Sequence, residues 1–129
     1  MELTQHHKEI LVECTEDNLG LWSIIWTVNG GGYSKNAILP EWVRQKTIEI
    51  VKDLLAQGLV EVGNFEAESF EFQPLLLSTE ETIKYIQREW DELGRPPTIG
   101  DVCWFRATAT GRQLAQQILT AQNDKASAD

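Results

Sequence analysis

The chain has 129 residues, of which 42% are hydrophobic and 24% charged, and these proportions are typical of one globular domain. There is no apolar run near the roughly 20 residues of a membrane span, no signal-peptide pattern, and two cysteines that lie far apart. These features argue against a membrane protein and a disulfide framework, so we expect a cytoplasmic protein with reduced thiols, although a single bridge between Cys14 and Cys103 stays open. The net charge of −9 opposes general affinity for nucleic acid.

Two helices are predicted ahead of a run of glycines. Apolar residues recur at helical spacing over 3–15, and Thr4 is placed to cap that helix. Residues 19–28 are apolar almost all round, which predicts a buried helix. The run Asn29-Gly30-Gly31-Gly32 ends this helix. Its order differs from that of a phosphate-binding loop, so we interpret it as a flexible turn.

The stretch from Pro40 to Gly63 organises the rest of the chain. Pro40 suits the first turn of a helix, and Gly58 suits its end. Residues 59–62 alternate as in a short strand, which Gly63-Asn64 is expected to break. Trp42 projects from the polar face of this helix. Either the incoming loop covers Trp42, which is common for first-turn residues, or its indole is exposed for a partner.

The segment 64–101 holds most of the acidity, with nine acidic against three basic residues, a net charge of −6. Its first part, 64–77, has no clean period and is predicted to be a loop carrying three phenylalanines. Ser78-Thr79-Glu80-Glu81 then has the form of a capping box, and Gly94 ends the helix that it opens. A strand over 102–106 and a helix capped by Thr108 or Thr110 complete the prediction.

The order of these elements resembles a winged-helix domain. The resemblance is carried by LLAQGLVEVG (54–63) and WFRATATGRQLA (104–115), and it covers about 18–63 and 102–121. The connection between the two strands departs from the family, because it contains a helix where a short wing is normal. We therefore predict an α+β, mainly α domain over 1–123. It has a winged-helix-like core, a small antiparallel β-hairpin, a helical insertion at 64–101 and a flexible tail at 124–129.

More loosely, the whole chain resembles small bacterial proteins, some of them from toxin-immunity loci. Winged-helix domains often pair through their terminal helices, which makes a homodimer one expectation for the first and last helices. Packing of both helices on the monomer core is the other expectation.

The pattern of charge favours a non-catalytic protein-interaction module, immunity-like or adaptor-like, with a basic protein as its partner. An acidic surface steers the encounter with a basic partner, and a buried aromatic anchors it. The alternative reading of these side chains is that the phenylalanines fill the core and the acids keep the chain soluble. The candidate partner-binding residues are Trp42, Glu66, Glu68, Phe70, Glu71 and Phe72.

Two other functions are weighed against this one. A winged helix would bind DNA through the helix at 40–58, but that helix is near neutral in charge and the insertion beside it is acidic. An enzyme is not expected, because the adjacent His6 and His7 do not form an i, i+4 metal pair. No metal, cofactor or catalytic residue is therefore predicted, and a Cys–His pair has nothing to support it.

Overall fold

The computed structural model describes residues 3–34, 36–66, 68 and 70–127, and over these it is an α+β fold that is mainly helical, as predicted. The elements in chain order are α1 (Gln5–Glu16), β1 (Leu19–Gly20), α2 (Leu21–Asn29), α3 (Glu41–Ala56), β2 (Val60–Phe65), β3 (Phe72–Pro74), α4 (Thr79–Leu93), β4 (Trp104–Ala107) and α5 (Ala109–Ser127).

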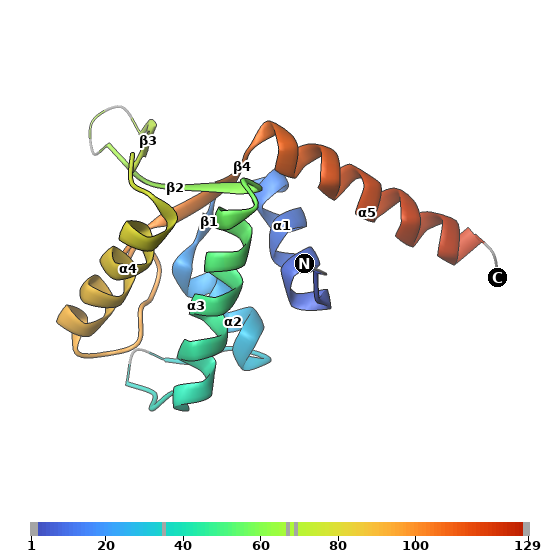
Figure 1. The fold of residues 1–129 in the computed structure, drawn as a ribbon. Coiled ribbons are helices and arrows are strands. Elements are labelled where there is room, and N and C mark those ends of the chain that lie inside the picture. The colour runs from blue at the N-terminus through green and yellow to red at the C-terminus, as the bar shows by residue number, and fades with distance from the viewer. Residues whose placement is uncertain (1–2, 35, 67, 69, 128–129) are drawn as a thin grey trace.

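The strands form one antiparallel sheet in the order β1-β4-β2-β3. Its centre is the pairing of β2 with β4, in which Val62 lies opposite Phe105. In sequence, β3 and α4 lie between these two strands, so a helical insertion does separate the paired strands. Figure 1 shows α1, α2 and α3 below β2 and β4, with α4 beside α3.

The core lies between the sheet and the helices. Alternation along β4 places Phe105 and Ala107 inside, in the same core cluster as the buried apolar stripe of α3 that the sequence indicated. The largest side chains with less than 2% exposure are mainly aliphatic: Phe105, Ile10, Leu11, Leu21, Ile24, Ile25, Ile50, Leu54, Ile86, Val43, Val51 and Thr47.

Local signals placed most helix ends correctly. Thr4 and Ser78 each cap a helix, as predicted. Ser78 does so in the expected capping box, and Thr4 forms one as well, with His7 in place of the usual Glu or Gln. Gly94 ends α4 in the left-handed conformation at φ 65°, and Gly58 follows α3 at φ 69°. Thr108 caps α5, because its hydroxyl oxygen accepts a hydrogen bond from the Gly111 N–H at 3.0 Å.

Several predicted boundaries were wrong. Residues 19 and 20 form a short strand, and the helix after them is not buried all round, since Trp26 is 45% exposed. Pro40 precedes α3 as its N-cap. The strand β2 continues through Gly63 to Phe65, because β3 approaches Gly63 so closely that a Cβ there would lie 2.3 Å from the Gln73 carbonyl oxygen.

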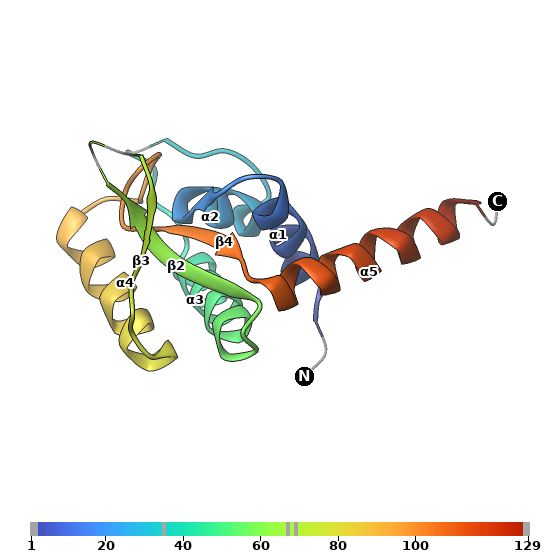
Figure 2. The same cartoon turned by 90° about the horizontal axis from the view of Figure 1, so that it is seen from above.

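The second half of the chain needs three further corrections. The stretch 64–77 contains the strand β3. The strand β4 begins at Trp104, two residues later than predicted, since Val102 has φ 69° and cannot extend it. The helix α5 includes 124–127, which the sequence assigned to a flexible tail, and residues 128 and 129 lie outside the described part of the chain. Figure 2 shows α5 running outward from the end of β4.

Candidate functional site

The turn between β2 and β3 gathers four of the predicted partner-binding residues. We call Glu66, Glu68, Phe70 and Glu71 the acidic tip. Beyond the last strand pair, the Glu66 N–H donates to the Glu71 carbonyl at 3.0 Å, and the Phe70 N–H donates to the Glu66 carbonyl at 2.9 Å. These hydrogen bonds fold the chain back on itself, so the tip is a closed turn with defined backbone partners.

Phe70 has unusual geometry for an aromatic residue. Its backbone is left-handed, with φ 57°, and its side chain is 78% exposed. A non-glycine residue in this region costs about 1–2 kcal/mol, and an exposed ring returns none of that by burial. The surrounding carboxylates of Glu66, Glu68 and Glu71 are exposed as well. The tip therefore presents one aromatic ring among negative charges.

Phe72, which was also predicted to bind a partner, lies in different surroundings from the residues of the acidic tip. It is half-buried, with its ring 5.9 Å from that of Phe65 and the Arg106 guanidinium 4.3 Å above it. Arg106 also pairs with Glu61 on the neighbouring strand. Because Phe65 and Arg106 both contact its ring, Phe72 packs the hairpin against the sheet next to the acidic tip.

Trp42 is exposed. The expectation that the loop before α3 covers it was therefore wrong. Its side chain is 55% exposed in the first turn of α3. The acidic tip follows the opposite end of this 16-residue helix, which is about 24 Å long. Figure 1 accordingly shows the tip at the top and the start of α3 at the bottom. The structure therefore separates Trp42 from the other candidates.

A second group of aromatics was missed by the sequence reasoning. Trp22 and Trp26 of α2 contact each other with ring centroids 6.0 Å apart, and Tyr33 lies 6.3 Å from Trp26. The i, i+4 spacing of the two tryptophans was a usable signal. The apolar character of the whole segment concealed it, because a tryptophan in such a helix is normally part of the core.

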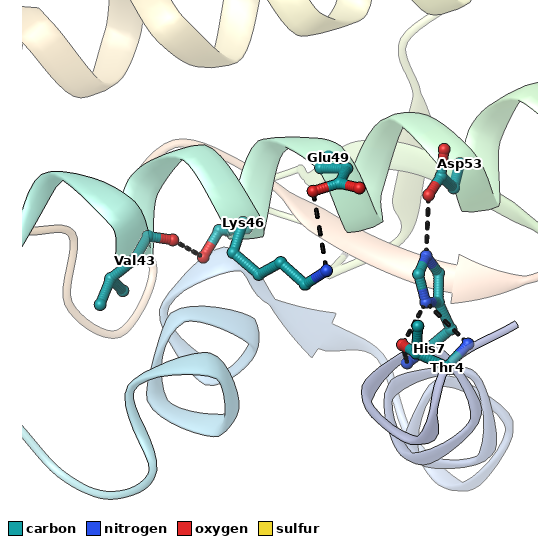
Figure 3. A network of polar contacts seen from close by, with 7 residues as sticks. Thr4, His7, Val43, Lys46, Glu49 and Asp53 are labelled. Carbon is teal, nitrogen blue, oxygen red and sulfur yellow. Dashed lines mark hydrogen bonds and ion pairs between the residues drawn. The ribbon is translucent and has the colours of Figure 1, made fainter.

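The histidine that the sequence reasoning considered for catalysis is buried. His7 is 2% exposed, and its Nε2 lies 2.9 Å from Asp53 Oδ2 (Figure 3). Its Nδ1 accepts the backbone N–H of Thr4 at 3.2 Å, so Nε2 carries the hydrogen and donates to Asp53. With both ring nitrogens used inside the protein, the pair connects α1 to α3 and is not presented to a substrate.

The two cysteines are buried free thiols. Burial raises the pKa of Cys14 to about 12, and burial also raises the pKa of Cys103. Such thiols are poor nucleophiles, because the thiolate is the reactive form. Among the described residues, no group of three or more His, Cys, Asp and Glu side chains is arranged to hold a metal ion.

Two of the three basic side chains of α3 are engaged in ion pairs. Arg44 lies 2.6 Å from Asp91 and also above the ring of Trp90. Lys46 lies 3.7 Å from Glu49, as Figure 3 shows. The Arg44 guanidinium lowers the pKa of Asp91 through their hydrogen bond. A DNA phosphate would have to compete with these carboxylates for the same cations.

Comparison of the chain with protein-family models, with curated proteins and with solved structures finds no match. In the described part of the chain, no helix has both the length and the apolar character needed to cross a membrane.

Proposed function

We propose that this protein is a non-catalytic interaction module that binds a basic protein partner through its acidic tip. The observation that carries the proposal is Phe70, held 78% exposed at φ 57° between Glu66 and Glu71. Backbone strain in a folded protein persists where the surrounding structure enforces it, and it concentrates at binding sites. Here the strain points an aromatic ring at solvent.

The chemistry of the tip suits a two-step association. The three carboxylates attract a positively charged surface over about 8 Å at physiological salt, which raises the association rate. Burial of the Phe70 ring in the complex then contributes about 1.5–3 kcal/mol, which slows dissociation. Phe72 and Arg106 hold the hairpin in place, so little ordering entropy is lost on binding. An immunity-like or adaptor-like role would use this combination of steering by charge and anchoring by an aromatic ring.

The test combines affinity purification from the cells that produce the protein with variants of the tip. We expect a partner that is retained at low salt, released at higher salt and unaffected by nuclease. Glu66, Glu68 and Glu71 changed together to lysine should slow association, and Phe70→Ala should speed dissociation. The matched control reverses the same number of charges at Glu9, Glu13 and Glu16 on α1, away from the tip.

Equal loss of binding in the control would mean that net charge alone attracts the partner, and the tip would have no specific role. Unchanged rates in both tip variants would refute the proposed surface.

DNA binding through α3 is the alternative. It is supported by the resemblance of 54–63 and 104–115 to a winged helix and by a strand pair that follows the helix. The ion pairs of Arg44 and Lys46 weigh against it. Recovery of DNA that disappears on nuclease treatment, with loss of binding on Lys46→Ala and Lys52→Ala, would favour this alternative over the protein partner.

A further inference from the structure

A small hollow opens beside α2, away from the elements that form the acidic tip. It has a volume of about 150 Å³, and we call it the aromatic hollow. Its walls come from α2, from the turn after it, and from the loop between α4 and β4. The lining residues are Trp22, Trp26, Tyr33, Thr98 and Ile99.

The rings of the hollow are held at steep angles to one another. The planes of Trp22 and Trp26 meet at 83°, and those of Trp26 and Tyr33 at 51°. Trp26 rests on Gly32, where an added Cβ would come within 2.6 Å of its ring. The rings therefore form walls of different orientation that exist before any ligand arrives.

The opposite wall is a braced loop. Asp101 accepts hydrogen bonds from Arg95 at 2.8 Å and from the backbone N–H and hydroxyl of Thr98 at 2.9 and 3.1 Å. The Arg95 hydrogen bond is the main cause of the lowered pKa of Asp101, so the carboxylate stays charged. These contacts position Ile99, which is 72% exposed, at the rim of the hollow.

The polar groups of Trp22, Tyr33 and Thr98 are turned into the protein. The Tyr33 hydroxyl is within hydrogen-bond distance of the carbonyls of Pro97, at 2.5 Å, and Trp22, at 3.3 Å. The Thr98 hydroxyl donates to Asp101, whereas the indole N–H of Trp22 is buried beside Gly20 and has no hydrogen-bond partner among the described residues. The two hydroxyls therefore offer no donor to an anion or a carbonyl ligand, and the Trp22 N–H is not exposed at the surface of the hollow.

We propose that the aromatic hollow binds a trimethylammonium head group. The face of an aromatic ring attracts a cation, and a cation without N–H groups loses little on leaving water. The lining residues carry no positive charge, and the chain as a whole carries −9, so the field also favours a cation. This site is independent of the acidic tip and of the partner proposed for it.

The size of the hollow fits a head group better than a whole ligand. Sites for complete small molecules are roughly 300–1,000 Å³, which is larger than the 150 Å³ available here. Because Trp26 and Ile99 at the rim are exposed, the hollow is open to solvent, and the rest of the ligand can remain in solvent.

The test compares choline with neohexyl alcohol, its neutral carbon isostere, in NMR titrations of the full chain that follow the tryptophan indole resonances. We expect saturable binding of choline that shifts the Trp26 and Trp22 signals, and binding of the isostere roughly tenfold weaker because it lacks the charge. Equal binding of both would show an ordinary apolar pocket and overturn the proposal, as would no binding of choline.

Two variants locate the site. Trp26→Phe keeps an aromatic side chain on α2 but presents a smaller ring to the cation, so it should weaken choline binding several-fold while the fold, followed by circular dichroism, is retained. Trp42→Phe, at the exposed tryptophan of α3, should leave choline binding unchanged. A peptide with one trimethyl-lysine should bind better than the same peptide with lysine, and equal affinity of the two peptides would contradict the proposed chemistry.

Discussion

His7 joins two helices through the two nitrogens of one ring. Nδ1 accepts the Thr4 N–H and completes the capping box of α1, while Nε2 donates to Asp53 of α3 (Figure 3). A glutamate or glutamine normally occupies this position of the box. Histidine adds a second contact, the hydrogen bond from Nε2 to Asp53. One residue therefore caps α1 and also fixes the position of α1 against α3.

We predict that His7→Ala lowers the free energy of unfolding by roughly 2–4 kcal/mol. The change leaves a cavity at a 2% exposed site and removes the hydrogen-bond donor of Asp53. His7→Gln retains an acceptor for the Thr4 N–H and should cost less than His7→Ala. Urea unfolding measures both variants, and an equal loss in the two would show that the capping bond contributes nothing.

Gly111 is a place where packing reverses a local preference. It lies inside α5, where alanine would normally be more favourable by about 1 kcal/mol. A Cβ at this position, however, would lie 2.0 Å from the Leu59 carbonyl oxygen and 3.3 Å from Leu11. The close approach of α5 to the chain before β2 depends on the missing side chain.

Gly111→Ala should therefore destabilise the protein by about 1–3 kcal/mol, since the backbone has to move to relieve the overlap. The control is Thr110→Ala, an exposed neighbour in the same helix, for which a change within about 0.5 kcal/mol is expected. Thermal unfolding of the two variants compares them directly. A stabilised Gly111→Ala would mean that helix propensity outweighs the overlap.

At the scale of elements, α4 is the helix whose sequence signals agree most fully with the structure. The Glu81 N–H donates to the Ser78 hydroxyl at 3.1 Å, and the Ser78 N–H donates to the Glu81 carboxylate at 3.3 Å. The side chains of Ile86 and Trp90, further along the helix, are buried. This helix stands between β3 and the loop that forms one wall of the aromatic hollow, so its N-terminal cap affects both neighbours.

Ser78→Ala should reduce the free energy of unfolding by about 1 kcal/mol, because one N–H of the first turn loses its acceptor. Glu81→Gln keeps both hydrogen bonds of the box and should change stability by less than half of that. Hydrogen exchange of the first turn of α4 is the measurement. Faster exchange confined to other helices would contradict the assignment of the cap.

At the scale of the whole molecule, the core holds both thiols in their neutral form. The pKa of Cys14 is raised from 9.0 to about 12 by burial, and the pKa of Cys103 is raised for the same reason. A group whose pKa is higher in the folded than in the unfolded state adds stability at pH values below its unfolded-state pKa. This contribution is lost as the pH rises above that pKa.

We therefore predict that stability falls as the pH rises above about 9, where the thiols of the unfolded chain ionise while those of the folded chain do not. Cys14→Ala should flatten this decline by roughly 1.4 kcal/mol per pH unit, even though it lowers stability at neutral pH. Urea unfolding at pH values on both sides of 9 measures the slopes. Identical slopes in the two proteins would show that Cys14 ionises equally in both states.

The sequence by itself determined the parts of this protein that depend on neighbours along the chain. The caps at Thr4 and Ser78, the glycines at 58 and 94 and the apolar stripe of α3 are set by backbone and side-chain preferences within one or two turns, and they were predicted correctly. The acidic tip could also be anticipated, because its acids and Phe70 lie close together in the sequence.

Only the tertiary structure decided the features that depend on distant segments. The strand β2 passes through Gly63 because β3 comes to lie beside it, and Phe72 is covered because Arg106 reaches it from β4. Trp26 and Trp42 remain exposed because no described segment buries them, a fact that their own hydrophobicity could not reveal. Whether an apolar side chain is buried depends on which surfaces meet when the chain folds, and its neighbours in sequence do not specify those surfaces.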